Sequence, residues 1–206
     1  MDNLLQFFPD LNPLQIEQFK QLEPLYREWN AKINVISRKD IDNLYEHHIL
    51  HSLAIAAFFS FSNHTILDVG TGGGFPGIPL AILFPDCQFT LIDAIGKKIK
   101  VVEQVSKTLG LTNVKALHIN VKEHKQMYNY VVSRAVCNFN EFVSLTRKNL
   151  KPSPKGGIIY LKGGDLDNEL EKFKHIVQVF NIYDKMPIPF FETKKIVWLK
   201  TNLLNH

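Results

Sequence analysis

The feature that most constrains this chain is a glycine-rich segment, Gly70-Thr-Gly-Gly-Gly-Phe-Pro-Gly77, which lies between two short apolar runs. The run at residues 65–69 is predicted to be a strand and the run at 78–84 a helix. Glycine has no Cβ, so the backbone can turn sharply there and approach a ligand closely. A strand, a glycine-rich turn and a helix in this order are typical of an α/β fold with a ligand at the turn.

Strands and helices alternate through the rest of the chain. The predicted strands cover residues 65–69, 88–93, 114–119, 130–133 and 158–162, followed by two closing strands at 176–183 and 196–201. Further helices are predicted at 95–109, 139–150 and 165–175, and a turn at 152–157. Such alternation indicates a mostly parallel, seven-stranded sheet with helices on both faces. In this Rossmann-like architecture, ligands bind at the carboxyl ends of the strands.

The first 62 residues contain no predicted strand. Asn12, Pro13 and Gln15 form a pattern that begins a helix, and Pro24 predicts either a kink or a division into two short helices. A second helix is predicted at 41–59, with Ser37 or Asp40 as its cap. Its expected buried side consists of Leu44, His48, Leu53, Ala56 and Ala57. We therefore divide the chain into a helical extension, 1–62, and a catalytic domain, 63–206.

Composition excludes several classes of protein. The chain has 206 residues, 45% of them hydrophobic, which is enough for one domain with a modest extension. Two cysteines rule out a disulfide scaffold and a four-cysteine zinc site. The sequence has no apolar stretch of the ~20 residues that a membrane span needs, and no signal-peptide pattern. We expect a cytoplasmic protein.

Charge is distributed unevenly along the chain. The net charge of +4 combines −3 in residues 1–62 with +7 in residues 63–206. An acidic partner is therefore expected to meet the C-terminal part. Lys97, Lys98 and Lys100 are candidate phosphate contacts there, although a lysine-rich helix face is commonly just solvated.

Two ligands compete for the glycine-rich segment. Residues 72–77 satisfy the G-x-G-x-x-G pattern of dinucleotide binders, whereas residues 68–74 follow the Asp-x-Gly-x-Gly-x-Gly pattern of S-adenosylmethionine (SAM) binders. A carboxylate at Asp68 would repel the pyrophosphate of NAD but suits the positive charges of SAM. Asp93, at the end of the second strand, can accept hydrogen bonds from the ribose of either ligand. The predicted SAM-binding residues are Asp68, Gly70, Gly72, Gly74 and Asp93.

Three histidines on the second helix raise the question of a metal. His47 and His51 are four residues apart and share one helix face, but no Glu follows His47 as in His-Glu-x-x-His sites. His48 belongs to the predicted apolar stripe. We expect no metal site.

Several segments of the chain resemble one protein family. They are residues 67–82 (LDVGTGGGFPGIPLAI), 90–93 (TLID), 96–98 (GKK), 132–135 (VSRA) and 161–163 (LKG), with Trp29-Asn30, Asn34 and residues 48–53 (HILHSL) nearer the N-terminus. Through them the chain resembles the bacterial small-subunit ribosomal RNA guanine-N7 methyltransferases, also called the glucose-inhibited division protein B family. The resemblance covers about residues 25–165. The family usually reads His-Ile-Leu-Asp-Ser, and His51 stands here in place of that Asp, so no catalytic role is placed on it.

The resemblance implies a site, a substrate and a mechanism. SAM contacts would fall on Gly70, Phe75, Val121, Lys122 and Arg134. The substrate would be a guanine in the 530-loop region of 16S rRNA, methylated at N7. That nitrogen has a lone pair and no proton, so alignment and desolvation, rather than a general base, would drive the reaction. Arg134, after the fourth strand, is the candidate catalytic residue, and a structural ion pair is its alternative role.

The expected partners are 16S rRNA or the 30S subunit, with no membrane and no metal, and we expect a monomer. Two other functions remain open at this point. A SAM-dependent methyltransferase of a small molecule or protein would use the helical N-terminus as a lid. A non-enzymatic nucleotide-binding module, or an NAD-linked reductase, would bind NAD rather than SAM.

Overall fold

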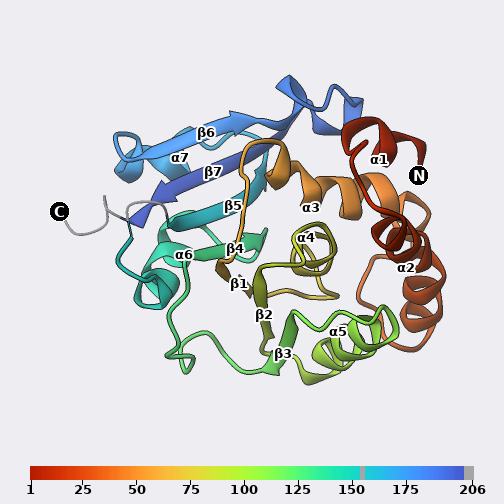
Figure 1. Ribbon diagram of the computed structural model, residues 1–206. Helices are drawn as coiled ribbons and strands as arrows, with labels where there is room; N and C mark the ends of the chain where they lie inside the picture. Colours follow the sequence, from red (N-terminus) through yellow and green to blue (C-terminus); the bar gives the residue numbers. More distant parts are fainter. Residues whose placement is uncertain (154–155, 202–206) are drawn as a thin grey trace.

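A seven-stranded sheet forms the centre of the molecule in the computed structural model, which describes residues 1–153 and 156–201 (Figure 1). The strands lie in the order β3-β2-β1-β4-β5-β7-β6. Their bounds are β1 Thr65–Val69, β2 Gln88–Asp93, β3 Val114–His118, β4 Tyr130–Arg134, β5 Gly157–Gly163, β6 Val177–Asn181 and β7 Lys194–Lys200. β7 runs antiparallel to both β5 and β6, and the other pairs are parallel. The expected mostly parallel sheet is confirmed. Residues 154–155, in the turn expected at 152–157, and residues 202–206 lie outside the described residues.

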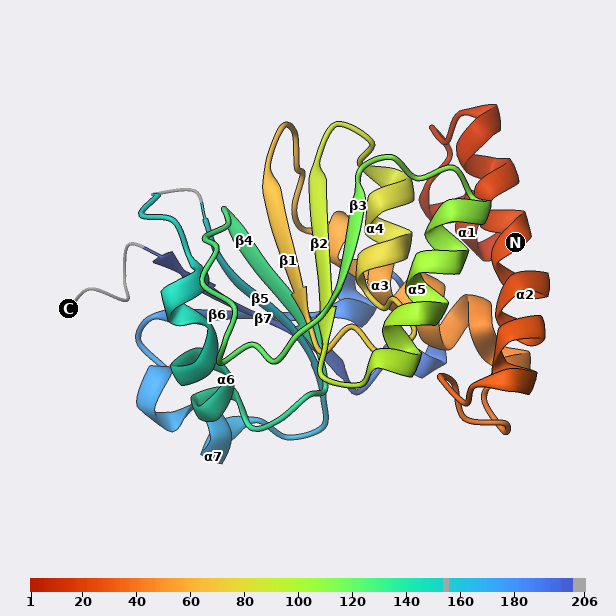
Figure 2. The same ribbon diagram turned by 90° about the horizontal axis from the view of Figure 1, so that it is seen from below.

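Helices cover both faces of this sheet (Figure 2). On one side lie α1 Asp2–Phe7, α2 Pro13–Lys32, α3 His51–Leu53, α4 Gly77–Leu83 and α5 Gly96–Thr108; on the other lie α6 Phe139–Thr146 and α7 Asp167–Leu170. The sequence did not predict α1. The helix expected at 139–150 ends in a 3₁₀ turn, Arg147–Asn149, and the one expected at 165–175 shortens to α7 and the 3₁₀ turn Glu171–Phe173.

The long helix α2 begins as its sequence predicts. The Asn12 side chain accepts a hydrogen bond from the Gln15 backbone N–H, and the Gln15 side-chain oxygen accepts one from the Asn12 N–H. The predicted division at Pro24 is wrong, because α2 is one helix of 20 residues. A proline in a helix removes one backbone hydrogen bond. Phe19 and Leu22 before Pro24 and Tyr26 after it are buried, and this packing keeps the two halves in one helix.

The second helix is irregular along its whole length. It consists of a 3₁₀ turn, Ile41–Asn43, a π-helical segment, Leu44–Leu50, the short α3, and a second 3₁₀ turn, Ala54–Ala57. The predicted buried side assumed α-helical spacing throughout. It is partly wrong because a π turn contains an extra residue and rotates the rest of the helix about its axis. The residues that are buried here are Leu44, Ile49, Leu50, His51, Ser52, Leu53, Ala54 and Ile55.

The N-terminal helices share one core with the sheet. Three buried polar side chains of α2 bond to backbone carbonyls beyond residue 62: Gln15 Nε2 to Ile82 at 2.9 Å, Gln18 Nε2 to Leu109 at 2.9 Å, and Tyr26 Oη to Gly73 at 2.6 Å. One hydrophobic cluster also runs from Leu4 to Ile196. The division at residue 62 stays a prediction about sequence organisation.

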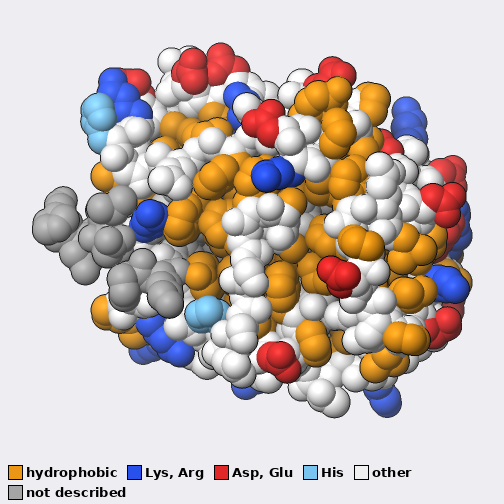
Figure 3. Space-filling view, turned by 45° about the horizontal axis from the view of Figure 1, so that its top comes forward, with side chains coloured by type: hydrophobic (Ala, Val, Ile, Leu, Met, Phe, Trp, Pro, Cys, Tyr) orange, Lys and Arg blue, Asp and Glu red, His pale blue; other side chains and the backbone are white. Residues whose placement is uncertain are grey.

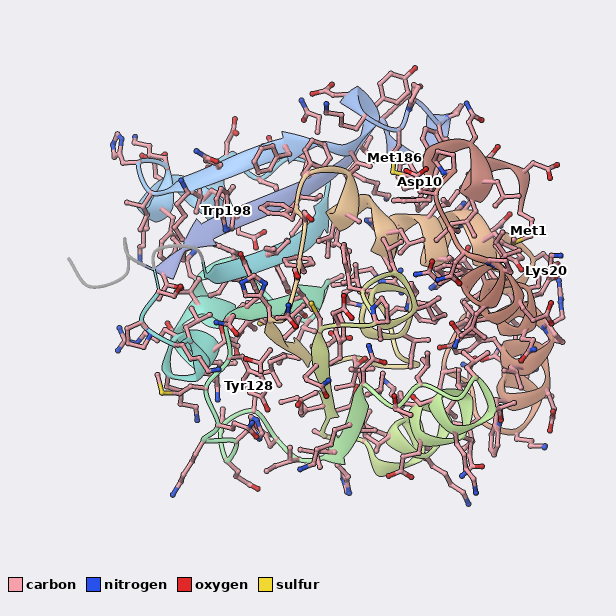
Figure 4. The ribbon with its side chains drawn as sticks, in the orientation of Figure 1. Met1, Asp10, Lys20, Tyr128, Met186 and Trp198 are labelled. Atoms are coloured by element: carbon pink, nitrogen blue, oxygen red, sulfur yellow. The ribbon has the colours of Figure 1, made fainter. Side chains whose placement is uncertain are left out.

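An aromatic contact joins the segment after the irregular helix to the β6–β7 edge. Phe59 meets Trp198 of β7 edge to face, with ring centroids 5.1 Å apart, and Phe180 of β6 at 5.7 Å (Figure 4 labels Trp198).

Figure 3 shows hydrophobic side chains gathered over the middle of one face, with few charged side chains among them. Within the described residues, no helix is both long enough and apolar enough to cross a membrane.

Candidate active site

Asp68, near the end of β1, holds the glycine-rich turn together. Its Oδ2 accepts hydrogen bonds from the Thr71 hydroxyl at 2.6 Å and from the Gly77 backbone N–H at 2.9 Å. The side chain is fully buried, and burial raises the pKa of Asp68 to about 7. No group in the described part of the chain hydrogen-bonds its Oδ1. The Asp68 carboxylate therefore fixes the shape of the turn through these two hydrogen bonds.

The turn itself needs its glycines. Gly70, Gly72 and Gly74 have backbone φ angles of +66°, +59° and +107°, in the region that favours glycine. A Cβ on Gly70 would lie 2.5 Å from Cγ2 of Val136, so the backbone at the end of β1 approaches the segment after β4 closely. A Cβ on Gly74 would likewise meet Ile78 at 2.6 Å, whereas Gly72 has open space around it and favours glycine through its φ alone.

A cleft of about 530 Å³, called here the cofactor cleft, opens at the carboxyl ends of β1, β2, β3 and β4. Its lining includes Gly70, Asp93, Ile95, Lys98, Val121, Lys122, Arg134 and Val136. Five of the predicted SAM-binding residues thus meet there: Gly70, Asp93, Val121, Lys122 and Arg134. The other four, Asp68, Gly72, Gly74 and Phe75, do not line the cleft and lie in the layer that supports it.

The chemistry of the cofactor cleft suits a nucleoside. Asp93 is nearly buried, and its two oxygens accept hydrogen bonds from the backbone N–H groups of Gly72 at 3.0 Å and Ile95 at 2.9 Å. A carboxylate has further lone pairs, so Asp93 can still accept from ribose hydroxyls. Ile92, Ile119 and Leu145 give the cleft apolar walls for a flat base. The residues present therefore fit SAM.

A second cavity of about 370 Å³, called here the histidine cavity, shares Arg134 and Ala135 with the cofactor cleft. Its other lining residues are Asp40, His47, His48, His51, Leu161, Lys162, Gly163, Phe190 and Lys194. Most of them come from the irregular helix, from β5, and from the β6–β7 connection. Arg134 and Ala135 thus form a side wall that both cavities share, along which two molecules can lie next to each other and react.

Arg134 is fixed within that wall. Its Nη1 donates a hydrogen bond to the His47 carbonyl at 3.1 Å, and its guanidinium lies over the ring of Phe75, 5.3 Å from the centroid. Burial lowers the pKa of Arg134 to about 10, so the side chain remains charged at neutral pH. Next to it, Ala135 has a φ of +50°, a left-handed conformation that costs an L residue about 1–2 kcal/mol.

His48 links Arg134 to Asp40. The Arg134 Nη2 lies 2.9 Å from Nδ1 of His48, and since a guanidinium only donates, Nδ1 accepts. The ring proton is then on Nε2, which donates to Asp40 Oδ2 at 2.6 Å. Burial lowers the pKa of His48 to about 4, so the ring is neutral at neutral pH. Asp40 does not cap its helix as expected; its carboxylate contacts His47 and His48 instead.

Two other cavity residues have clear partners. The Lys162 ammonium pairs with Glu169 at 2.8 Å, so this lysine, at the carboxyl end of β5, belongs to an ion pair. The ring of Phe190, in the 3₁₀ turn Pro189–Phe191, stacks on His47 with centroids 3.9 Å apart. In the described ranges, no group of three or more His, Cys, Asp or Glu side chains is arranged to hold a metal ion.

Sequence reasoning missed Asp40, Phe190 and Lys194 as site residues. Phe190 and Lys194 lie over 50 residues beyond Arg134 in the sequence, and no spacing rule joins segments so far apart. A signal did exist for the irregular helix, where a polar ring, His48, interrupts an apolar stripe. Such a ring on a buried face needs polar partners.

Comparison with known proteins identifies related sequences over nearly the whole chain. Residues 15–197 match the family model described as rRNA small subunit methyltransferase G. A ribosomal RNA small subunit methyltransferase G from Flavobacterium psychrophilum is 55% identical over 202 residues, which cover 96% of each chain. Another from Bacteroides fragilis is 50% identical over 204 residues, covering 97% of this chain and 99% of its own.

Solved structures show the same fold at much lower identity. A SAM-dependent methyltransferase from Aquifex aeolicus aligns with a TM-score of 0.58 and 17% identity, over 80% of this chain and 98% of that one. The N-methyltransferase NodS from Bradyrhizobium japonicum, solved with S-adenosyl-L-homocysteine, aligns with a TM-score of 0.57 and 12% identity, over 84% and 96%. The predicted Rossmann-like methyltransferase fold is confirmed.

Proposed function

The chain belongs to the family of rRNA small subunit methyltransferase G, and on that premise we propose that it methylates N7 of a guanine in the 530-loop region of 16S rRNA. S-adenosylmethionine is the methyl donor; it supplies a methyl group activated by a positively charged sulfur. The observation that carries the proposal is that the cofactor cleft and the histidine cavity adjoin, with Arg134 and Ala135 lining both. A base in the second cavity would lie directly beside a cofactor in the first.

In this proposal the residues position and desolvate rather than transfer protons. Guanine N7 carries a lone pair and no proton, so its attack needs no general base. In-line approach to about 3 Å is the main requirement, and a rigid site supplies it by orientation. Asp93, Val121 and Lys122 would hold the cofactor at the strand ends. Arg134 keeps N–H groups beyond the two hydrogen bonds described above, and these would orient the base.

The basic surface of the C-terminal part supports an RNA substrate. Lys98 and Lys122 line the cofactor cleft, and Lys97 and Lys100 are exposed on the same helix as Lys98. Cations around the mouth of a site attract a phosphate backbone over a distance of about a Debye length. We expect a monomer acting on 16S rRNA or on the 30S subunit.

Methyl transfer from labelled SAM tests this proposal. The protein is incubated with 30S subunits and, separately, with naked 16S rRNA, and reductive strand scission at 7-methylguanine locates the base. Label at a single guanine supports the proposal. If neither the 30S subunits nor the naked 16S rRNA is labelled under any salt or assembly condition, the proposal is contradicted. That result would favour a small molecule or a protein as the substrate.

A further inference from the structure

One nitrogen of the histidine cavity has no partner inside the described part of the protein. His51 is only 7% exposed and lines the cavity. Within residues 1–153 and 156–201, no group forms a hydrogen bond with its Nε2. Buried polar atoms are nearly always hydrogen-bonded, so an exception beside a reactive site points to a ligand group that completes it.

The protonation of the ring makes this nitrogen an acceptor. A backbone hydrogen bond with His47 acts on the ring, and since Nε2 has no partner, we assign this bond and the ring proton to Nδ1. Burial, with the charges of Arg134 and Lys194, holds the pKa of His51 well below its usual value, so the ring stays neutral. Phe190 and Phe191 flank the ring, with centroids at 5.7 and 5.9 Å. The neutral ring thus leaves Nε2 a lone pair; the atom itself is buried, so a base reaches it only when the ring or Phe190 shifts on binding.

The polar groups of the cavity distinguish the two purines of RNA. Both purines have a lone pair at N7, so the reacting atom alone does not separate them. Guanine presents an O6 acceptor and an N1–H donor, whereas adenine presents an amine donor and a lone pair at N1. Arg134 and Lys194 bring donors to the cavity, and His51 brings an acceptor. This set complements guanine and opposes adenine at both positions.

Asp40 is the other acceptor to consider among these lining residues. Each of its oxygens already contacts a histidine, Oδ1 that of His47 and Oδ2 that of His48. Its carboxylate therefore serves to hold the wall around Arg134. Asp40 keeps further lone pairs, but both its oxygens have partners, whereas Nε2 of His51 has none within the described residues.

We propose that His51 determines base specificity: its Nε2 accepts the N1–H of the guanine to be methylated and so selects guanine over adenine. This inference rests on the proposed function and adds the residue that reads the base. A site built to hydrogen-bond one substrate group discriminates strongly against an analogue that lacks it.

The test compares two variants on two substrates. His51→Phe keeps an aromatic ring between Phe190 and Phe191 but has no acceptor, and His51→Gln returns a side-chain oxygen. The ratio of kcat/KM is measured for 30S subunits with guanine or adenine at the methylated position. We expect His51→Phe to lower the guanine-to-adenine ratio roughly tenfold to a hundredfold and His51→Gln to restore part of it. The exposed His175→Phe is the matched control and should leave the ratio unchanged.

The ratio separates specificity from folding, because a misfolded fraction lowers both rates equally. An unchanged ratio in His51→Phe would overturn the inference, and so would a ratio that falls in Asp40→Asn but not in His51→Phe. If no variant methylates adenine measurably, kcat/KM for the guanine substrate decides. A lower kcat/KM in His51→Phe that His51→Gln partly restores supports the inference, and any other pattern overturns it. Wild-type protein that never forms 7-methylguanine would contradict the proposed function itself.

Discussion

Arg134 donates a hydrogen bond to Nδ1 of His48 across 2.9 Å, although the two residues are 86 positions apart in the sequence. The contact joins the end of β4 to the π-helical segment and continues through Nε2 of His48 to Asp40. It holds a buried guanidinium in the side wall that the two cavities share. The N-terminal helices thereby build part of the site as well as part of the core.

Replacing Arg134 by lysine tests this wall. Lysine keeps the charge but lacks the planar fork that reaches the His47 carbonyl and the His48 ring together. We expect kcat/KM for methylation to fall roughly tenfold to a hundredfold, since the loss of hydrogen bonds to a charged group amounts to about 1.5–3 kcal/mol. Steady-state kinetics with labelled SAM measures the effect. The exposed Arg147→Lys is the control; equal activity of the two variants would argue against a positioning role for the fork.

Replacing Gly70 and Gly110 separately by alanine distinguishes the effect of backbone strain on stability from the effect of the cofactor cleft on SAM binding. Gly70 and Gly110 both have φ of +66°, but an added Cβ meets Val136 at 2.5 Å only at Gly70 and has open space at Gly110. Either change to alanine should lower the free energy of unfolding by about 1–2 kcal/mol. Gly70→Ala alone should also weaken SAM binding, by roughly tenfold or more, because the turn must move in the cofactor cleft. Calorimetry and denaturant unfolding measure the two effects, and equal SAM affinity in both variants would contradict the assignment of the cleft.

Asp68 gives a pH dependence with a definite sign. Its folded pKa, about 7, is above the ordinary value of 3.8. The folded state therefore holds more protons between these values, and its stability falls as pH rises through that window. Asp68→Asn keeps an oxygen for Thr71 and Gly77 but does not titrate. The stability of the wild type relative to this variant should decline from about pH 4 to about pH 7 and then level off. Urea unfolding across this range would reveal a flat difference if the pKa were ordinary.

The lysines of α5 are expected to contact RNA phosphates. Neutralising Lys97, Lys98 and Lys100 together should make the plot of log affinity against log salt less steep, by roughly 0.7–0.9 for each phosphate that these lysines neutralise. Filter binding of 16S rRNA at several salt concentrations measures this slope. Neutralising Lys20, Lys32 and Lys39, exposed lysines of the acidic N-terminal part, is the control of equal charge. The same slope for both triple variants would place the RNA elsewhere.

Local patterns predicted the sheet better than the helices around the site. Every strand was found within two residues of its expected bounds, because short apolar runs between turn residues specify strands locally. The capping pattern of Asn12 and Gln15 likewise specified its helix start. Of the two alternatives at Pro24, a kink or two short helices, the division is wrong, because packing keeps both halves of α2 in one helix. The irregular helix misled because a pattern based on α-helical spacing cannot register a π turn.

The sequence by itself determined the glycine-rich turn, the alternation that makes a parallel sheet, and the family. Each of these is written in residues close together in the chain, where backbone freedom and hydrophobic spacing act. Only the tertiary structure decided that Asp68 faces the turn rather than the cleft, that Asp40 and His48 hold Arg134, and that Phe190 and Lys194 complete a second cavity. Those contacts join segments far apart in sequence, and their geometry depends on how the helices pack on the sheet.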